Sequence, residues 1–172
     1  ESLCYMPGYG IATAAATLIG QSIGAKRDDL ARRLGMLTVA LGMAVMSVGG
    51  ALMYVFAPMM IGIMSPDPAV VELGTSVLRI EAFAEPMFAA SIVASGVFRG
   101  AGDTLVPSIF TFFSMWGVRL PLAALLAPRI GLYGVWIAMA ADIIVGGILF
   151  LMRLRGSRWM PNIDPSRKFG SD

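Results

Sequence analysis

The chain has 172 residues, of which 57% are apolar and 14% charged, and its mean hydropathy is +0.76. Soluble domains are about 45 to 50% apolar and about 25% charged, so this composition excludes an ordinary soluble globule and a disordered chain. The single cysteine, Cys4, excludes an internal disulfide, and the absence of histidine removes the commonest metal ligand and general base. We therefore expect no enzyme activity, no metal site and no cofactor.

Five apolar segments follow one another along the chain, and each is close to the roughly 20 residues that a helix needs to cross a bilayer. The predicted spans are 3–25, 34–60, 80–98, 105–127 and 132–152. Residues 69–79 are mixed and either lie at the interface or extend the third span. We therefore predict an all-α membrane protein, with a membrane-embedded lobe over residues 1–155 and a polar cytoplasmic tail over residues 156–172.

The start of the chain is apolar without a basic region or a cleavage site, and Glu1 is not a start methionine. This pattern is not typical of a signal peptide, so we expect a fragment of a larger membrane protein.

The formal charge is only +2, and the basic residues gather in short patches beside the apolar segments, which indicates membrane topology rather than nucleic-acid binding. With five spans, ten Lys and Arg residues fall on one side and two, Arg79 and Arg129, on the other. The ten are Lys26, Arg27, Arg32, Arg33, Arg99, Arg153, Arg155, Arg158, Arg167 and Lys168. Because positive loops stay in the cytoplasm, the first span begins outside and the tail lies inside.

Four motifs follow one another along the chain: PGYGIATAAATLIGQSIGAKR from Pro7, FRGAGDT from Phe98, VRLPLA from Val118 and GLYGVWIAMAAD from Gly131. In this order they resemble the multidrug and toxic compound extrusion (MATE) family of antiporters. The resemblance implies twelve helices in two six-helix lobes with a cytoplasmic C-terminus, and these spans are similar to helices eight to twelve. It implies that the partner of this lobe is the missing N-terminal lobe, and that a coupling carboxylate on the seventh helix precedes Glu1.

Ionisable side chains at membrane depth are functional candidates, because insertion of each costs about 2.5 to 3.5 kcal/mol. Glu81 and Glu85 stand four residues apart on one helical face, where they form a proton or cation site. Alternatively, Glu81 lies near the outer interface in contact with water and Glu85 pairs with Arg119. Arg119 and Asp142 fall at similar depths on neighbouring spans. We predict that they form an intramembrane ion pair, either structural or one that breaks and reforms during gating.

Small and polar residues complete the set of candidates. Gly20 with Gly24, and Gly96 with Gly100, have the G-x-x-x-G spacing that lets helices pack closely. Gln21, near the inner end of the first span, either lines a transport pathway or bonds to a neighbouring helix. Trp159, beside Arg158, is predicted to be an interfacial anchor.

The leading hypothesis for function is an antiporter, driven by Na⁺ or H⁺, that exports small cationic amphiphilic compounds across the plasma membrane, the inner membrane in bacteria. Its warrant is mainly the resemblance. The alternatives are a related lipid or oligosaccharide flippase and a channel subunit. A flippase is expected to hold phosphate with several basic residues in its cavity, whereas Arg119 is the only basic residue predicted to lie deep in the membrane. This charge balance favours export of cations.

Overall fold

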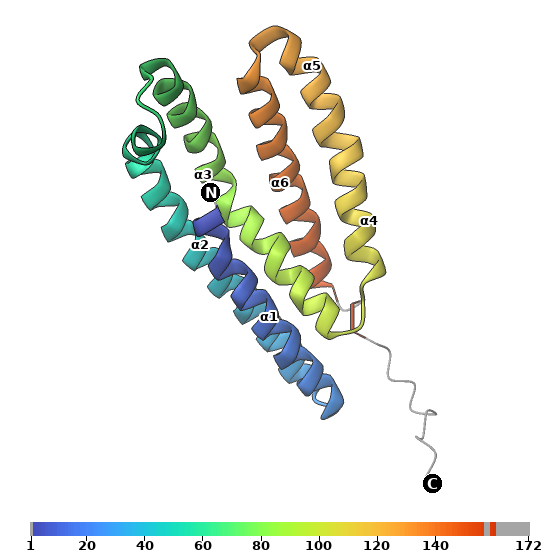
Figure 1. Cartoon of the computed structure of the whole chain (residues 1–172). Coiled ribbons are helices and arrows are strands. Elements are labelled where there is room, and N and C mark those ends of the chain that lie inside the picture. Colours follow the sequence, from blue (N-terminus) through green and yellow to red (C-terminus); the bar gives the residue numbers. More distant parts are fainter. Residues whose placement is uncertain (1, 157–158, 161–172) are drawn as a thin grey trace.

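The computed structural model describes residues 2–156 and 159–160, and these residues are helical or in turns, with no strand among them. Its elements are α1 (Ser2–Gly24), α2 (Asp28–Met64), α3 (Pro68–Gly100), α4 (Leu105–Ser114), the π-helix η1 (Met115–Arg119), α5 (Leu120–Ile130) and α6 (Leu132–Arg155). Because α4, η1 and α5 form one continuous rod, the elements make five rods that match the five predicted segments (Figure 1). The all-α prediction is confirmed.

The rods form two groups around α3. α1 and α2 pack against α3 on one side, and α6 packs against its other side and carries the rod of α4, η1 and α5 (Figure 1). The α1–α2 turn, the α3–α4 turn and the end of α6 lie at one end of the bundle, and the α2–α3 and α5–α6 turns at the other. Seven of the ten predicted cytoplasmic charges lie in or beside these turns and the end of α6, and therefore at one end of the bundle. Arg158, Arg167 and Lys168 lie outside the described residues.

Three helical rods of the described residues are long and apolar enough to cross a membrane, namely α2, Leu105–Ile130 and α6. α1 and α3 do not meet this measure. Glycine, threonine and glutamine dilute the apolar residues of α1, and α3 carries Glu72, Arg79, Glu81 and Glu85. Both helices lie against neighbours in the bundle, which lets them carry polar residues that a lipid-facing helix avoids.

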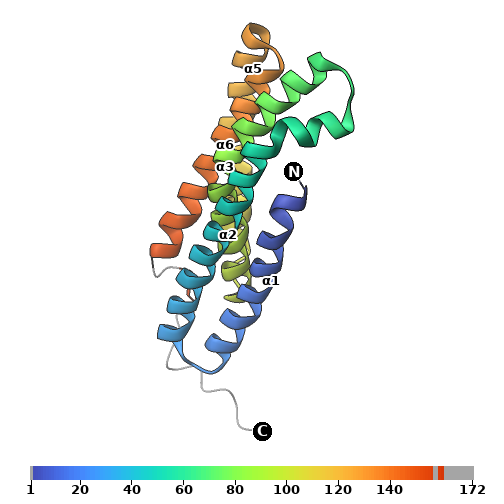
Figure 2. The same ribbon diagram turned by 90° about the vertical axis from the view of Figure 1, so that its left-hand side faces the viewer.

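Two helices are longer than predicted. α3 includes residues 69–79, so this stretch extends the third span rather than lying apart from it. The Asp67 side chain caps its first turn by accepting from the Ala69 N–H at 2.9 Å, and Pro68 fits the first helical position, where no N–H is needed. α2 begins at Asp28, because two acidic residues in its first turn complement the helix dipole. Its last turns bend away from the long axis, and Pro58 is the proline within this helix (Figure 2).

The core lies where α1, α2, α3 and the end of α6 meet, and it is built from small and branched residues around three aromatic side chains. Phe98 and Phe150 stack with ring centroids 5.9 Å apart. Trp159 packs against Phe98 at 6.0 Å and is 2% exposed. The predicted role of Trp159 as an interfacial anchor is therefore wrong, because its ring fills the core. Residues 157–158 and 161–172 of the predicted tail lie outside the described residues.

Candidate functional site

A pocket of about 350 Å³ opens between α1, α3, α4, η1 and α6. Its wall is apolar where Tyr9, Phe88 and Phe150 face it, and polar where Ser114, Arg119 and Asp142 face it. Pockets of this kind, mostly apolar with a few polar groups, are the usual form of a small-molecule site. The pocket therefore brings together two of the predicted site residues, Arg119 and Asp142.

The π-helix explains how Ser114 and Arg119 reach the same pocket. In an α-helix two residues five positions apart are about 140° apart around the axis. In η1 the Leu120 N–H bonds to the carbonyl of Met115, five residues back, so positions 114 and 119 return to nearly the same face. Pro121 favours the wider turn of a π-helix, because proline has no N–H to donate and its ring would clash with the carbonyl four residues before it in an α-helix.

Asp142 does not pair with Arg119 as predicted. The ion pair found among the described residues joins Arg153 to Asp103. The Ser114 hydroxyl instead lies 3.1 Å from the Asp142 carbonyl oxygen and also contacts the Asp142 carboxyl group. Ser114 is 5% exposed. Arg119 and Asp142 do line one pocket, as their similar depths predicted. The group that contacts Asp142, however, is the hydroxyl of Ser114 on the neighbouring helix.

Glu81 and Glu85 lie nearer the start of α3 and do not line this pocket. They are 4% and 2% exposed. Gly50 of α2 lies against Glu85, since a Cβ atom at Gly50 would approach the Glu85 Cβ to 3.1 Å. Both side chains are thus buried in the lobe, and Glu85 lies at the α2–α3 interface. Gln21, by contrast, is exposed on α1.

The four glycines that were predicted to allow close helix packing differ in how near they lie to a neighbouring helix. A Cβ atom at Gly96 would come within 2.9 Å of the Ala12 Cα, and one at Gly100 within 2.9 Å of the Ala16 Cα. The backbones of α3 and α1 are therefore in direct contact at both positions. A Cβ atom at Gly20 would lie 3.5 Å from the carbonyl oxygen of Gly100, an ordinary contact, and nothing lies within 4 Å of a Cβ atom at Gly24.

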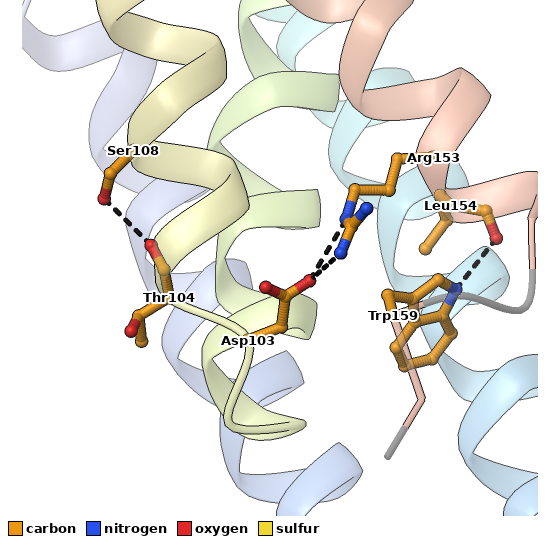
Figure 3. Close-up of polar contacts among 6 residues, drawn as sticks. All are labelled: Asp103, Thr104, Ser108, Arg153, Leu154 and Trp159. Atoms are coloured by element: carbon orange, nitrogen blue, oxygen red, sulfur yellow. Dashed lines mark hydrogen bonds and ion pairs between the residues drawn. The ribbon is translucent and has the colours of Figure 1, made fainter. Parts of the chain in front are cut away.

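The sequence did not predict the ion pair and the hydrogen bond that hold the end of α6. The Arg153 guanidinium donates to the Asp103 carboxylate in the α3–α4 turn and lies 5.8 Å from the centre of the Phe98 ring (Figure 3). The Trp159 indole N–H donates to the Leu154 carbonyl at 3.1 Å. Asp103 stands in the FRGAGDT motif, and Arg153 was read only as a topology signal. Only the fold brings two residues 50 positions apart together.

Comparison with known proteins gives a consistent result. The MatE family model matches residues 1–125. A probable multidrug resistance protein NorM of Thermotoga maritima is 32% identical over 163 residues, covering 92% of this chain and 35% of that protein. A probable NorM of Chromobacterium violaceum is also 32% identical, covering 92% of this chain and 36% of its own. The chain thus spans about a third of the length of these curated relatives.

Two solved structures share the fold. The MATE transporter ClbM in complex with Rb⁺ superimposes with a TM-score of 0.84 at 26% identity, covering 92% of this chain and 38% of that one. A multidrug resistance MATE family transporter in an inward-facing conformation gives 0.81 at 19% identity, covering 90% of this chain and 36% of that one. The second likeness concerns the fold alone.

Proposed function

Because this chain belongs to the MATE family of multidrug efflux transporters, we propose that it forms most of one lobe of a cation-coupled antiporter. The lobe works with a second, N-terminal lobe of the same protein and exports small cationic amphiphilic compounds by alternating access, with Na⁺ or H⁺ as the coupling ion. The names of the relatives support efflux over the flippase and channel alternatives. Lipid surrounds the lobe on its apolar faces.

The observation that carries this proposal is the pair of carboxylates, Glu81 and Glu85, buried on one face of α3. Burying a carboxylate in a membrane helix is costly unless a proton, a cation or a partner group compensates it. Two carboxylates one turn apart repel each other when both are charged, which favours uptake of a positive ion. Such a pair can exchange its ion for a cationic substrate during the transport cycle.

Replacing Glu85 by glutamine is expected to reduce ion-driven efflux of a cationic dye by at least about fivefold, because ion and substrate binding are coupled by 1 to 3 kcal/mol in typical cases. A neutral amide cannot take up and release a cation. Glu85 is the less exposed of the two, so Glu81→Gln is expected to have the smaller effect. The measurement is dye efflux from proteoliposomes of the intact protein under a Na⁺ or H⁺ gradient.

Glu72→Gln is the matched control, because Glu72 is exposed on the same helix. Its efflux should equal that of the unchanged protein. Normal efflux in both Glu85→Gln and Glu81→Gln between pH 6 and pH 8 would remove the pair from the mechanism.

We also propose that the lobe lies in the plasma membrane, the inner membrane in bacteria, with the end of α6 in the cytoplasm, as the ten-to-two charge bias favours. Lys26 is exposed in the α1–α2 turn and Arg129 is exposed in the last helical turn of α5, at opposite ends of the bundle. In a Cys4→Ser background, Arg129→Cys should react with an impermeant thiol reagent in intact cells. Lys26→Cys should react only after the cells are opened. The reverse labelling pattern would overturn the orientation.

A further inference from the structure

Basic side chains gather at the end of the bundle where α2 begins and α6 ends. They form a basic patch made of Lys26, Arg27, Arg32, Arg33 and Arg155, all of them exposed. The ion pair in the described part of the chain joins Arg153 to Asp103, so none of these five forms one there. The exposed carboxylates of Asp28 and Asp29 stand beside them, and five cations against two anions leave a formal excess of three positive charges. Such a patch attracts an anionic ligand.

One hydrogen bond brings the two helices of the patch together. The Arg32 guanidinium of α2 donates to the Arg155 carbonyl oxygen in the last turn of α6 at 3.2 Å. The last carbonyl groups of a helix have no partner within the helix, so this contact satisfies one of them. The first turns of α2 and the end of α6 therefore lie side by side (Figure 2). The Arg32 side chain stays exposed, which leaves its other N–H groups for a ligand.

A surface pocket of about 360 Å³ begins at the patch. The residues that line it all belong to α2, and they are Asp29, Arg32, Arg33, Met36 and Leu37. The pocket is thus charged toward the α1–α2 turn and apolar toward the middle of the helix. The apolar surface continues beyond the pocket, since Leu37, Leu41 and Val45 are four residues apart on one face and are 58%, 55% and 38% exposed.

This order of charged and apolar side chains matches one leaflet of a bilayer. From Arg33 to Val45 the helix rises about 18 Å, and half of a bilayer with its headgroups measures about 20 to 22 Å. A guanidinium binds a phosphate group through paired N–H groups. A free anion would meet the charges but would leave Met36 and Leu37 uncovered, whereas the acyl chain of a lipid covers them. An anionic phospholipid therefore fits both parts of the surface.

We propose that the basic patch binds an anionic phospholipid, with its headgroup phosphate on Arg32 and Arg33 and an acyl chain along Met36, Leu37 and Leu41. In the orientation proposed above, this lipid belongs to the cytoplasmic leaflet, where basic residues beside membrane helices meet anionic lipids. The site does not depend on what the lobe transports.

A phosphatidylglycerol that carries a fluorophore on one acyl chain tests the site in the intact purified protein in a non-ionic detergent. Fluorescence anisotropy gives the apparent Kd of this probe. Arg33→Gln and Arg32→Gln should each raise the Kd about fivefold, the usual contribution of one basic residue to the binding of anionic lipid. Asp29→Asn should lower the Kd, because it removes a carboxylate from the pocket. Tighter binding in this variant cannot result from misfolding.

Arg129→Gln is the matched control, because Arg129 is exposed in the last turn of α5 at the other end of the bundle. It should leave the Kd unchanged. An unchanged Kd in both Arg33→Gln and Arg32→Gln would overturn the proposal.

Competition identifies the occupant. Unlabelled phosphatidylglycerol should displace the probe, whereas phosphatidylcholine with the same acyl chains and inorganic phosphate should not. Equal displacement by phosphatidylcholine would overturn the proposal, because the surface would then bind lipid without regard to headgroup charge. Displacement by inorganic phosphate would also overturn it, because the site would then take a free anion. Efflux is not part of this measurement, so failure of the antiporter function would leave the expected result unchanged.

Discussion

Replacing Gly96 by alanine is expected to destabilise the lobe, although alanine is the better helix former by about 1 kcal/mol. The new methyl group would meet the backbone of α1 at Ala12, with the Ala12 Cα at 2.9 Å. Backbone cannot move aside as a flexible side chain can, so α1 and α3 must separate along their contact. Overpacking of this kind typically costs 1 to 3 kcal/mol, and it exceeds the gain in helix propensity. Gly100→Ala, which meets Ala16, is expected to behave in the same way.

Gly49→Ala is the matched control, because Gly49 lies in the middle of α2 and no atom stands within 4 Å of its added Cβ. This variant should be neutral or more stable than the unchanged protein. The measurement is the thermal midpoint of the purified intact protein in detergent. If Gly96→Ala and Gly49→Ala change the midpoint by the same amount and in the same direction, the close contact of α1 with α3 is not a source of stability.

The sequence predicted the helices well because long apolar segments with charged or proline-containing breaks leave few alternatives. The predicted boundaries of the first and last spans lie within a few residues of the ends of α1 and α6. The predicted second span was shorter than α2, because the polar first turn of α2 is helical without being apolar. The spacing of Gly96 and Gly100 indicated a close helix contact, and the structure contains one. The same spacing at Gly20 and Gly24 is not matched by such a contact, since the spacing does not say which face meets a neighbour.

The sequence identified the polar residues of the site, but it did not predict which of them contact one another. Depth along two helices placed Arg119 and Asp142 at one level, but it could not include the π-helix that brings Ser114 onto the same face. The available signal for the π-helix was Pro121, which follows a stretch that contains Gly117. Trp159 was misplaced for a related reason, because a tryptophan beside an arginine after a span is typical of an interface. Only the three-dimensional arrangement of α2, α3 and α6 provides the space that its ring fills.

Truncating Trp159 to alanine is expected to lower the stability of the lobe by about 3 to 5 kcal/mol, the usual cost of removing a large buried aromatic side chain. The ring is 2% exposed, packs against Phe98 and lies 3.6 Å from the position that a Cβ atom at Gly35 would occupy. It therefore joins α2 and α3 to the end of α6. Its loss leaves a cavity beside Phe98, which also contacts Phe150 and the Arg153 guanidinium.

Trp159→Phe separates the packing of the ring from its hydrogen bond. Phenylalanine fills most of the space but cannot donate to the Leu154 carbonyl, so we expect a loss of about 0.5 to 1.5 kcal/mol beyond the effect of the smaller ring. Trp116→Ala is the matched control, because Trp116 is 60% exposed on η1 and its truncation opens no cavity within this lobe. Thermal midpoints of the intact protein in detergent rank the three variants. Equal midpoints for Trp159→Ala and Trp116→Ala would mean that the ring of Trp159 does not hold the end of α6 to the core.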